Sequence, residues 1–329
     1  MASDTGIEWT DRTWNPVRGC SRVSPGCQNC YAERIATRFS GPGKPYDGLI
    51  KLLGKRHPAT GQPPGGTRGR WNGTVRMIDR HLHDPLAWRE PSKIFVNSMS
   101  DLFHENLSVM DIAAVFGVMA VAARHTFQFL TKREVQMRYW YRMLVENAGT
   151  NAIITAAYER LADAGQRVWA DEVVRAFDGG VPWPLPNVWA GVSVENREHG
   201  LPRIDALREI PATVRFLSIE PLLEDLGELD LTGIHWVIVG CESGPGARPC
   251  KASWIRNVRD ACRRYGVPMF LKQANDEIEL APAPHHAISM SDRSTQKTKR
   301  LIGLPALDGV VYANFPKTES TSTSCNTDS

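Results

Sequence analysis

Short apolar runs alternate with amphipathic stretches along most of the chain. The runs cover residues 93–97, 126–130, 188–192, 214–217, 235–239 and 268–271. Helical patterns follow several of them, up to about 124, 146, 207 and 265. Short buried strands that alternate with helices are typical of βα units around a parallel sheet. With residues 13–18 as a first strand, the pattern predicts about seven units.

Seven units favour an α/β fold of the (β/α) barrel type, either complete or partial, over a small open sheet. In such a fold the loops that follow the strands form the active face. Nearly all the polar clusters of this chain follow an apolar run. We therefore expect one barrel-like domain over residues 1–317, with its polar strand ends gathered on one face.

Three segments depart from this rhythm. Residues 41–73 are rich in Gly, Pro and basic residues, which predicts a long loop or insertion. Residues 151–186 carry a helical pattern that ends in Gly and Pro, and we interpret them as an insertion after the third unit. The tail 318–329 is rich in Ser and Thr, which predicts disorder. A helix is expected over 31–39, where Ile35 and Phe39 lie four residues apart.

Three cysteines follow the first predicted strand. Cys20, Cys27 and Cys30 have the spacing C-x6-C-x2-C. A structural zinc site is normally closed by four protein ligands, so three clustered cysteines point elsewhere. An iron–sulfur cluster with one iron free of protein ligands fits the count, because thiolates are its usual donors. The alternatives are a zinc site completed by a distant His or Cys, and thiols that bind nothing.

Composition adds few constraints. The formal net charge is only +3, but basic residues outnumber acidic ones in the N-terminal part, which permits an anionic partner. Seven cysteines, four of them scattered, do not form a secreted disulfide framework. The start of the chain lacks signal-peptide order, and the longest apolar run, 112–123, is too short to cross a bilayer. We expect a soluble, cytoplasmic protein without membrane contact.

Five segments carry recognisable motifs: the loop from Trp14 to Cys20, the segment 95–104, and the strand ends 129–133, 191–196 and 239–244. Together they resemble the phage-associated three-cysteine-motif family. The match covers most of the chain apart from 41–73, 151–186 and the tail. Members of that family look like radical S-adenosylmethionine proteins, which resemble partial (β/α) barrels with a cysteine loop after the first strand.

This resemblance implies cofactors. Cys20, Cys27 and Cys30 would ligate a [4Fe–4S] cluster, and the free iron would chelate S-adenosylmethionine. An electron from a donor protein would then give a 5′-deoxyadenosyl radical, chemistry that belongs to the cofactor. The chain departs from the common C-x3-C-x2-C spacing and has Asn29, not an aromatic residue, before the third cysteine.

The resemblance also assigns polar strand ends to the cosubstrate. The residues expected to bind it are Asn97, Ser98, Asp101, Ser193, Glu195, Asn196 and Gly240. The first three would grip the methionine amine, and the next three the ribose hydroxyls and carboxylate. Helix capping is the alternative interpretation of both polar groups, because Ser, Asp and Asn are good caps. Gly240 belongs to a glycine loop suited to the close approach of an adenine, although no dinucleotide fingerprint is present.

Charged residues at other strand ends are candidates for the substrate side. They are Lys132, Arg133, Glu220, Glu242 and Lys272. Arg and Lys could bind a carboxylate or phosphate, and the glutamates could accept hydrogen bonds or handle protons. The alternatives are solvated charges at a strand end for Lys132 and Arg133, and ordinary ion pairs for the two glutamates.

The leading hypothesis is therefore a radical S-adenosylmethionine-type enzyme acting on an unknown substrate, anionic or a nucleic acid. A competing hypothesis is a zinc-stabilised nucleic-acid-binding protein without radical chemistry. A third is a barrel that keeps the cluster only for structure.

Overall fold

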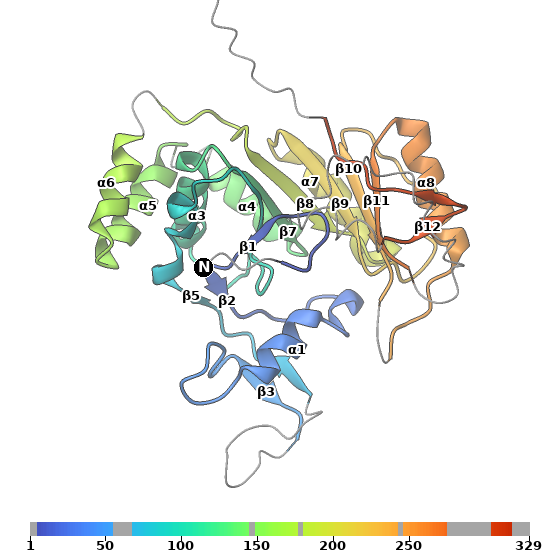
Figure 1. The fold of residues 1–329 in the computed structure, drawn as a ribbon, viewed down its shortest axis with the longest axis horizontal. Helices are drawn as coiled ribbons and strands as arrows, with labels where there is room; N and C mark the ends of the chain where they lie inside the picture. The colour runs from blue at the N-terminus through green and yellow to red at the C-terminus, as the bar shows by residue number, and fades with distance from the viewer. Residues whose placement is uncertain are drawn as a thin grey trace, which may run out of the picture.

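In the computed structural model, which describes residues 5–54, 68–144, 149–176, 180–242, 246–274 and 304–317, the chain folds around one parallel sheet. Its seven strands follow one another in the order β1-β6-β7-β8-β9-β10-β11 (Figure 1). They are β1 (Arg12–Trp14), β6 (Lys93–Val96), β7 (Thr126–Thr131), β8 (Val188–Ser193), β9 (Val214–Ile219), β10 (Trp236–Gly240) and β11 (Met269–Gln273). All six apolar runs of the sequence, together with the first part of the expected strand 13–18, thus become strands of one sheet.

The sheet is a curled half-barrel. The two outer strands, β1 and β11, each have one neighbour in the seven-stranded sheet, so the barrel does not close among the described residues. This confirms the α/β class with a partial parallel barrel. One boundary was wrong: the expected strand 13–18 breaks after Trp14, and β2 (Val17–Arg18) pairs antiparallel with β5 (Arg76–Met77). Pro16 lies at the break and has no N–H for a ladder bond.

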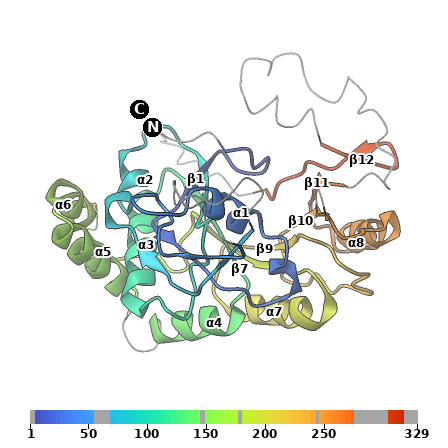
Figure 2. The same ribbon diagram turned by 90° about the horizontal axis from the view of Figure 1, so that it is seen from below.

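Helices cover the outer side of the sheet (Figure 2). The longer ones are α3 (Val109–Val121), α4 (Glu134–Met143), α7 (Arg197–Glu209) and α8 (Ala252–Tyr265). A short helix, α2 (Asp84–Ala87), and a 3-10 turn, η2 (Asp79–His81), precede β6. α3 begins with a capping box, in which Ser108 accepts from the Asp111 N–H and the Asp111 carboxylate accepts from the Ser108 N–H.

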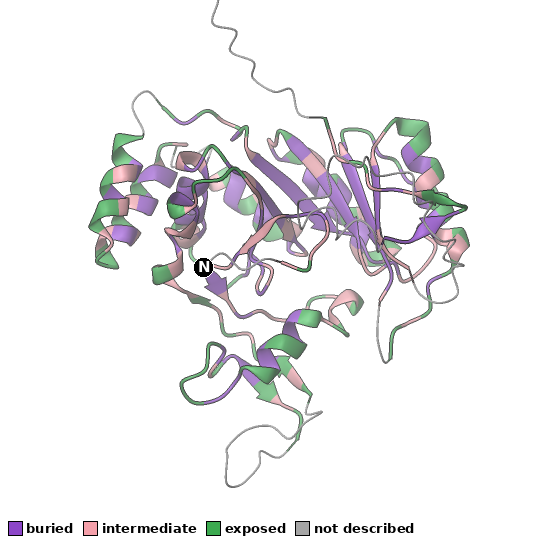
Figure 3. Cartoon of the chain, viewed as in Figure 1, coloured by how far each residue is buried: buried purple, intermediate pink, exposed green. Residues whose placement is uncertain are grey.

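Alternating strand residues divide between two cores, as the period of two in a strand requires. Residues such as Phe127, Val192 and Leu217 belong to the larger core with the helices. Residues between them, such as Phe216 and Trp236, form an inner aromatic cluster. The full inner cluster is Trp9, Phe95, Trp189, Val214, Phe216, Trp236, Ile238, Phe270 and Leu304. The strands are accordingly buried along most of their length (Figure 3).

Residues 304–317, which we call the C-terminal strap, pack on the inner cluster beside β11. The strap contains the small hairpin β12 (Ala306–Leu307) and β13 (Val310–Val311). The Trp236 indole N–H donates to the Asn314 carbonyl over 2.8 Å, and the Phe315 ring lies 5.2 Å from that of Trp236. The Leu271 N–H donates to the Tyr312 carbonyl. The strap therefore covers part of the free edge of the half-barrel.

A small N-terminal lobe, residues 31–54 and 68–77, projects from the sheet (Figure 1). It contains α1 (Tyr31–Arg38) and an antiparallel pair, β3 (Ile50–Leu52) with β4 (Gly69–Trp71). We expected a long loop or insertion over 41–73, and the β3–β4 pair within it was not predicted, because two strands of three residues leave no readable periodicity. Residues 55–67 lie outside the described residues.

The 151–186 segment forms two helices, α5 (Ala152–Asp163) and α6 (Arg167–Arg175). They lie on the outer side of α3, between β7 and β8 along the chain (Figures 1 and 2). No helix among the described residues is long and apolar enough to cross a bilayer. The tail 318–329 lies outside the described part.

Candidate functional site

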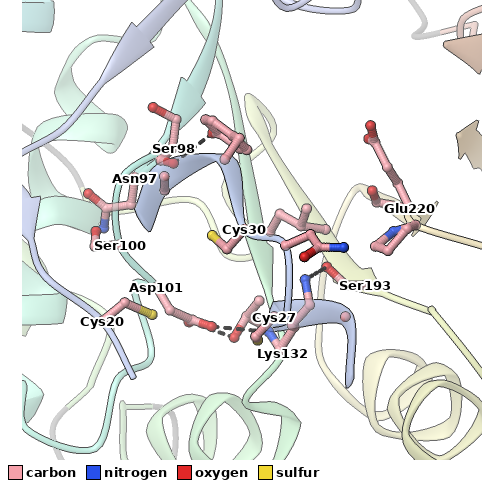
Figure 4. A pocket seen from close by; sticks show the side chains of 18 of the residues that line it. Cys20, Cys27, Cys30, Asn97, Ser98, Ser100, Asp101, Lys132, Ser193 and Glu220 are labelled. Atoms are coloured by element: carbon pink, nitrogen blue, oxygen red, sulfur yellow. Dashed lines mark hydrogen bonds between the residues drawn. The ribbon is translucent and has the colours of Figure 1, made fainter. Parts of the chain in front are cut away.

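A pocket of about 310 Å³ lies where the carboxyl ends of the strands meet the cysteine loop (Figure 4). The predicted site residues that line it are Cys20, Cys27, Cys30, Asn97, Ser98, Asp101, Lys132, Arg133, Ser193, Glu220, Glu242 and Lys272. Glu195, Asn196 and Gly240 are not among the lining residues. The fold thus brings three cysteines and the polar ends of β6 to β11 to one cavity.

The floor of the pocket is apolar. Ile7, Trp9, Phe95 and Leu130 line it, and all four belong to the inner cluster or pack against it. Trp9 and Phe95 are almost completely buried, with ring centroids 4.8 Å apart. A ligand would therefore meet polar groups around the rim and aromatic surface beneath.

The cysteine loop runs between β2 and α1. It contains a 3-10 turn, η1 (Pro25–Cys27), and Cys30 is the N-cap residue of α1. Gly19, just before Cys20, has a φ of 98°, and a Cβ there would lie 2.1 Å from the Thr74 carbonyl oxygen. Only glycine tolerates both conditions, so Gly19 fixes how the chain enters the loop.

The three thiols lie close enough to interact electrostatically. Burial raises the pKa of the Cys20 thiol to about 12, the Arg133 guanidinium opposes this, and Cys30 and Cys27 raise the pKa further. Burial also raises the pKa of Cys30, against the backbone N–H groups of Glu33 and Ala32 and the charge of Lys132. Without a bound cation, Cys20 and Cys30 are therefore thiols at neutral pH, and a metal centre would have to displace their protons.

Arg133 ties the loop to the end of β7. Its guanidinium donates to Ser21 Oγ over 2.7 Å, to the Ser21 carbonyl and, over 3.7 Å, to Cys20 Sγ. The same group binds Asp101 over 3.1 Å and Glu105 over 2.7 Å. Arg133 is only 6% exposed, so its charge is compensated inside the protein.

Asp101 is fully engaged by this arrangement. One carboxylate oxygen accepts from Thr131 Oγ1 over 2.7 Å and from the Phe103 N–H. The other accepts from Arg133 and from the Lys132 N–H over 3.1 Å. The carboxylate therefore orders the ends of β6 and β7 rather than leaving a lone pair free toward the cavity.

Two further contacts fasten the loop to β8 and β10. Ser24 Oγ donates to the carboxylate of Glu195, which is completely buried and paired with Arg203. Burial alone would raise the pKa of Glu195, but the charges of Lys132 and Arg203 lower it, so the group stays ionised. The neighbouring Asn196 is the N-cap of α7, where its side chain accepts from the His199 N–H.

The second contact comes from Asn29, between the last two cysteines. Its side-chain amide donates to Glu242 over 2.9 Å and to the Gly246 carbonyl. Glu242 is also paired with Arg248, which lowers the pKa of Glu242 against the effect of burial. The loop is thus held by the ends of three strands, β7, β8 and β10.

Asn97 follows β6 in a left-handed conformation, with φ at 60°. Its Oδ1 accepts from the Val17 N–H over 3.4 Å, while its buried Nδ2 has no partner among the described residues. The adjacent Ser98 donates to Asn15 Oδ1, and its carbonyl accepts from the Tyr31 hydroxyl over 2.7 Å. Asn97 therefore lines the pocket and carries one buried donor without a partner among the described residues.

Two lysines complete the rim. Lys132 Nζ donates to Ser193 Oγ over 2.9 Å, and no ion pair of Lys132 occurs within the described part of the chain. Lys272 Nζ lies 2.5 Å from Glu220 Oε1. Burial alone would lower the pKa of Lys272, but Glu220 raises it, so the pair is ionic. Gly240 lies under Glu220: a Cβ there would be 3.2 Å from Glu220 Oε1.

The described metal-ligating side chains around the pocket do not surround a single metal ion. Among the described residues, no three His, Cys, Asp or Glu side chains converge enough to hold one metal ion. Tetrahedral zinc would bring its thiolates to about 3.8 Å from one another. A cluster would leave them farther apart, because each thiolate binds a different iron. The described residues therefore show no closed site for one metal ion around the cysteines.

Sequence reasoning missed the residues that hold the loop. Ser24 and Asn29 make contacts across 171 and 213 residues of sequence. Such partners have no spacing signal in one sequence. Two residues of the pocket wall were missed as well: Trp71 lies in the segment expected as a loop or insertion, and Tyr31 was predicted only as part of a helix.

Comparison with known proteins gives a family but no activity. Neither the curated proteins nor the solved structures contain a significant match to this chain. One family model matches residues 4–316, which is nearly the whole chain and includes the cysteine loop and every strand of the sheet. The chain therefore belongs to the family described as "Protein of unknown function (DUF5131)".

Proposed function

We propose that this protein is a radical S-adenosylmethionine-type iron–sulfur enzyme. Cys20, Cys27 and Cys30 would hold a [4Fe–4S] cluster, and the polar rim of the pocket would bind the cosubstrate. When bound, these groups supply a 5′-deoxyadenosyl radical after reduction by one electron. The protein would orient the reactants and shield them from water.

The observation that supports this most is the shared cavity. Three thiols separated by six and two residues line the same pocket as the ends of six parallel strands. A half-barrel with a cysteine loop at its carboxyl end is also the architecture that the motif resemblance implies. A ligand at an open iron would lie between that loop and the strand ends.

Each rim group has a role that its present contacts allow. The free Nδ2 of Asn97 would donate to an oxygen of the cosubstrate. Ser193, held by Lys132, would meet a hydroxyl group, and Lys132 itself would attract a carboxylate or phosphate. Glu220 and Lys272 form a pair that could exchange its internal bond for bonds to a polar substrate. The aromatic floor would exclude water from the radical.

A reducing, cytoplasmic setting, which the scattered spacing of the cysteines in the sequence favours, is part of this proposal. Such a setting would also supply the electron-donor protein that this function needs.

Metal analysis after oxygen-free purification tests the proposal. We expect about four iron and four sulfide per chain and a brown colour. Cys27→Ser should abolish both, because it removes one of three ligands. Cys262→Ala, at a buried cysteine of α8 away from the pocket, should keep the iron.

Activity is the second measurement. The iron-loaded protein should convert S-adenosylmethionine to 5′-deoxyadenosine when reduced with dithionite, and Cys27→Ser should not. Colourless protein with one zinc per chain would reject the proposal in favour of a zinc-stabilised binding protein. An intact cluster without 5′-deoxyadenosine would indicate a structural cluster.

A further inference from the structure

The N-terminal lobe carries an unbalanced positive surface. Its seven cationic residues are all exposed: Arg34, Arg38, Lys44, Lys51, Arg68, Arg70 and Arg76. None of them forms an ion pair with another residue that the structure describes. Of its two acidic residues, Glu33 is buried and paired with Arg22, and only Asp47 remains near the surface. This surface therefore attracts anions.

Apolar side chains lie among these charges. Tyr31, Ile35 and Phe39 recur every four residues, so they lie on one side of α1 and just beyond its end. Their exposed fractions are 42, 41 and 44%. The Arg38 guanidinium lies 5.8 Å from the Phe39 ring. Exposed aromatic rings beside unpaired cations are the elements of a surface that stacks bases and follows phosphates.

The lobe does not need this exposed stripe for its own folding. The opposite side of α1 supplies Ala32 and Ala36 to a separate small core with Tyr46, Leu49 and Trp71. That core holds α1 against β3 and β4, so the stripe is presented by a packed element. No described residue covers the stripe.

The charged surface continues into the pocket. Tyr31, Arg34 and Trp71 belong to the lobe, and all three also line the pocket. α1 begins directly after Cys30, so its first turn lies beside the cysteine loop. A polymer lying along α1 would thus have one of its units at the pocket mouth, while its neighbours contact Arg38 and Phe39.

We propose that the lobe binds single-stranded nucleic acid, or a locally opened strand, and that one nucleotide of it is the substrate presented to the pocket. This rests on the proposed function for its chemical step, but not for binding. Phosphates complement the unpaired cations, and bases complement the aromatic rings. Enzymes that modify a base reach it in a single strand or after flipping it from a duplex. An acidic protein would match the charges and leave the rings without a matching partner.

Fluorescence anisotropy with labelled 20-nucleotide probes tests the proposal on the full chain as purified. A single-stranded DNA, an RNA of the same sequence and the DNA duplex should distinguish the possible sources. We expect the better single strand to bind with an affinity that falls steeply with salt. The charge-reversal variant Lys51→Glu/Arg70→Glu changes two exposed residues that face each other in the β3–β4 pair.

This double variant should bind at least about tenfold more weakly, with a salt slope smaller by about 1.4, since each single-strand phosphate contact contributes about 0.7. Phe39→Ala should weaken binding about tenfold with an unchanged slope, because stacking carries no charge. The matched control is Arg167→Glu/Arg175→Glu, two exposed arginines of α6, which lies far from α1 in Figures 1 and 2. The affinity of this control variant for the probe should lie within about twofold of that of the wild type.

Absence of binding at 50 mM salt for every probe, or unchanged binding by both lobe variants, would overturn the proposal. Displacement by poly-glutamate as readily as by unlabelled oligonucleotide, with Phe39→Ala unaffected, would assign the surface to an acidic protein instead. The binding proposal and the proposed enzyme function can be rejected independently of each other. Binding by a protein without iron would keep this inference and reject the enzyme, whereas production of 5′-deoxyadenosine without probe binding would do the reverse.

Discussion

At the scale of single residues, Arg133 connects the candidate site to the fold. Its guanidinium reaches the cysteine loop at Ser21 and Cys20 and two carboxylates, Asp101 and Glu105. Breaking a buried pair leaves an uncompensated charge, which is far more costly than losing an exposed one. The position of Cys20 therefore depends on carboxylates that do not touch it.

Glu105 makes this dependence testable through pH. Burial alone would raise the pKa of Glu105, but the hydrogen bond and charge of Arg133 lower it to about 2. Because the folded-state pKa lies below the unfolded value, Glu105 stabilises the protein above about pH 4.5, and this contribution is lost as pH falls toward about 2. The side chain is 48% exposed, so the contribution at pH 7 should be on the order of 1 kcal/mol.

We expect Glu105→Gln to lower the free energy of unfolding in urea at pH 7 by about this amount. The difference from the wild type should shrink steadily between pH 5 and pH 3. Glu159→Gln, at an exposed glutamate of α5, is the control and should show no such trend. A difference that persists unchanged at pH 3 would mean that Glu105 acts through packing rather than charge.

At the scale of elements, neighbouring strands depend on a single glycine. Gly191 of β8 lies opposite Phe216 of β9, and a Cβ at Gly191 would be 2.3 Å from the Phe216 ring. Phe216 is completely buried in the inner cluster. The absence of a side chain on β8 therefore makes the space for an aromatic ring on β9.

Gly191→Ala should destabilise the protein by about 1–3 kcal/mol, because the ring cannot move without disturbing the cluster. The smaller side chain of Phe216→Leu should relieve the clash, so Gly191→Ala should cost less in that background. A double-mutant cycle by urea denaturation measures the coupling. Equal costs in both backgrounds would show that the two residues do not compete for space.

At the scale of elements, the sequence alone predicts the strands of the sheet but not the contacts between distant segments. All seven strands were predicted, because buried parallel strands are continuous apolar runs between polar clusters. The cysteine loop and twelve pocket residues were predicted because they follow those runs. The β3–β4 pair was missed, since three residues are too few for a periodic signal. Contacts such as Ser24 with Glu195 were missed, because only the tertiary fold brings these residues together.

At the scale of the whole molecule, the C-terminal strap complements the half-barrel. Strands β1 and β11 are its two edges, and the strap covers the inner cluster beside β11 through Tyr312, Asn314 and Phe315. The ammonium of Lys93, at the start of β6, lies 4.3 Å from the Phe315 ring. The strap thus joins residues from both halves of the sheet.

A chain that ends at residue 303 should therefore be less stable and should expose the inner cluster, which increased fluorescence of bound ANS would report. Phe315→Ala should cost about 2 kcal/mol, less than a fully buried ring, because Phe315 is only partly buried. A chain that ends at residue 317 keeps the strap and is the control. Unchanged stability on removing 304–317 would show that the inner cluster does not need this cover.

The place of the strap in the sequence has a consequence for biosynthesis. The last strand of the sheet is complete at Gln273, but the segment that seals its aromatic interior ends only at residue 317. At about 5–20 residues per second, a ribosome needs roughly 2–9 s to make the intervening stretch. Throughout that interval Trp236 and Phe270 lack their contacts with Phe315, so we expect a chaperone that recognises aromatic surface to engage the chain late in translation.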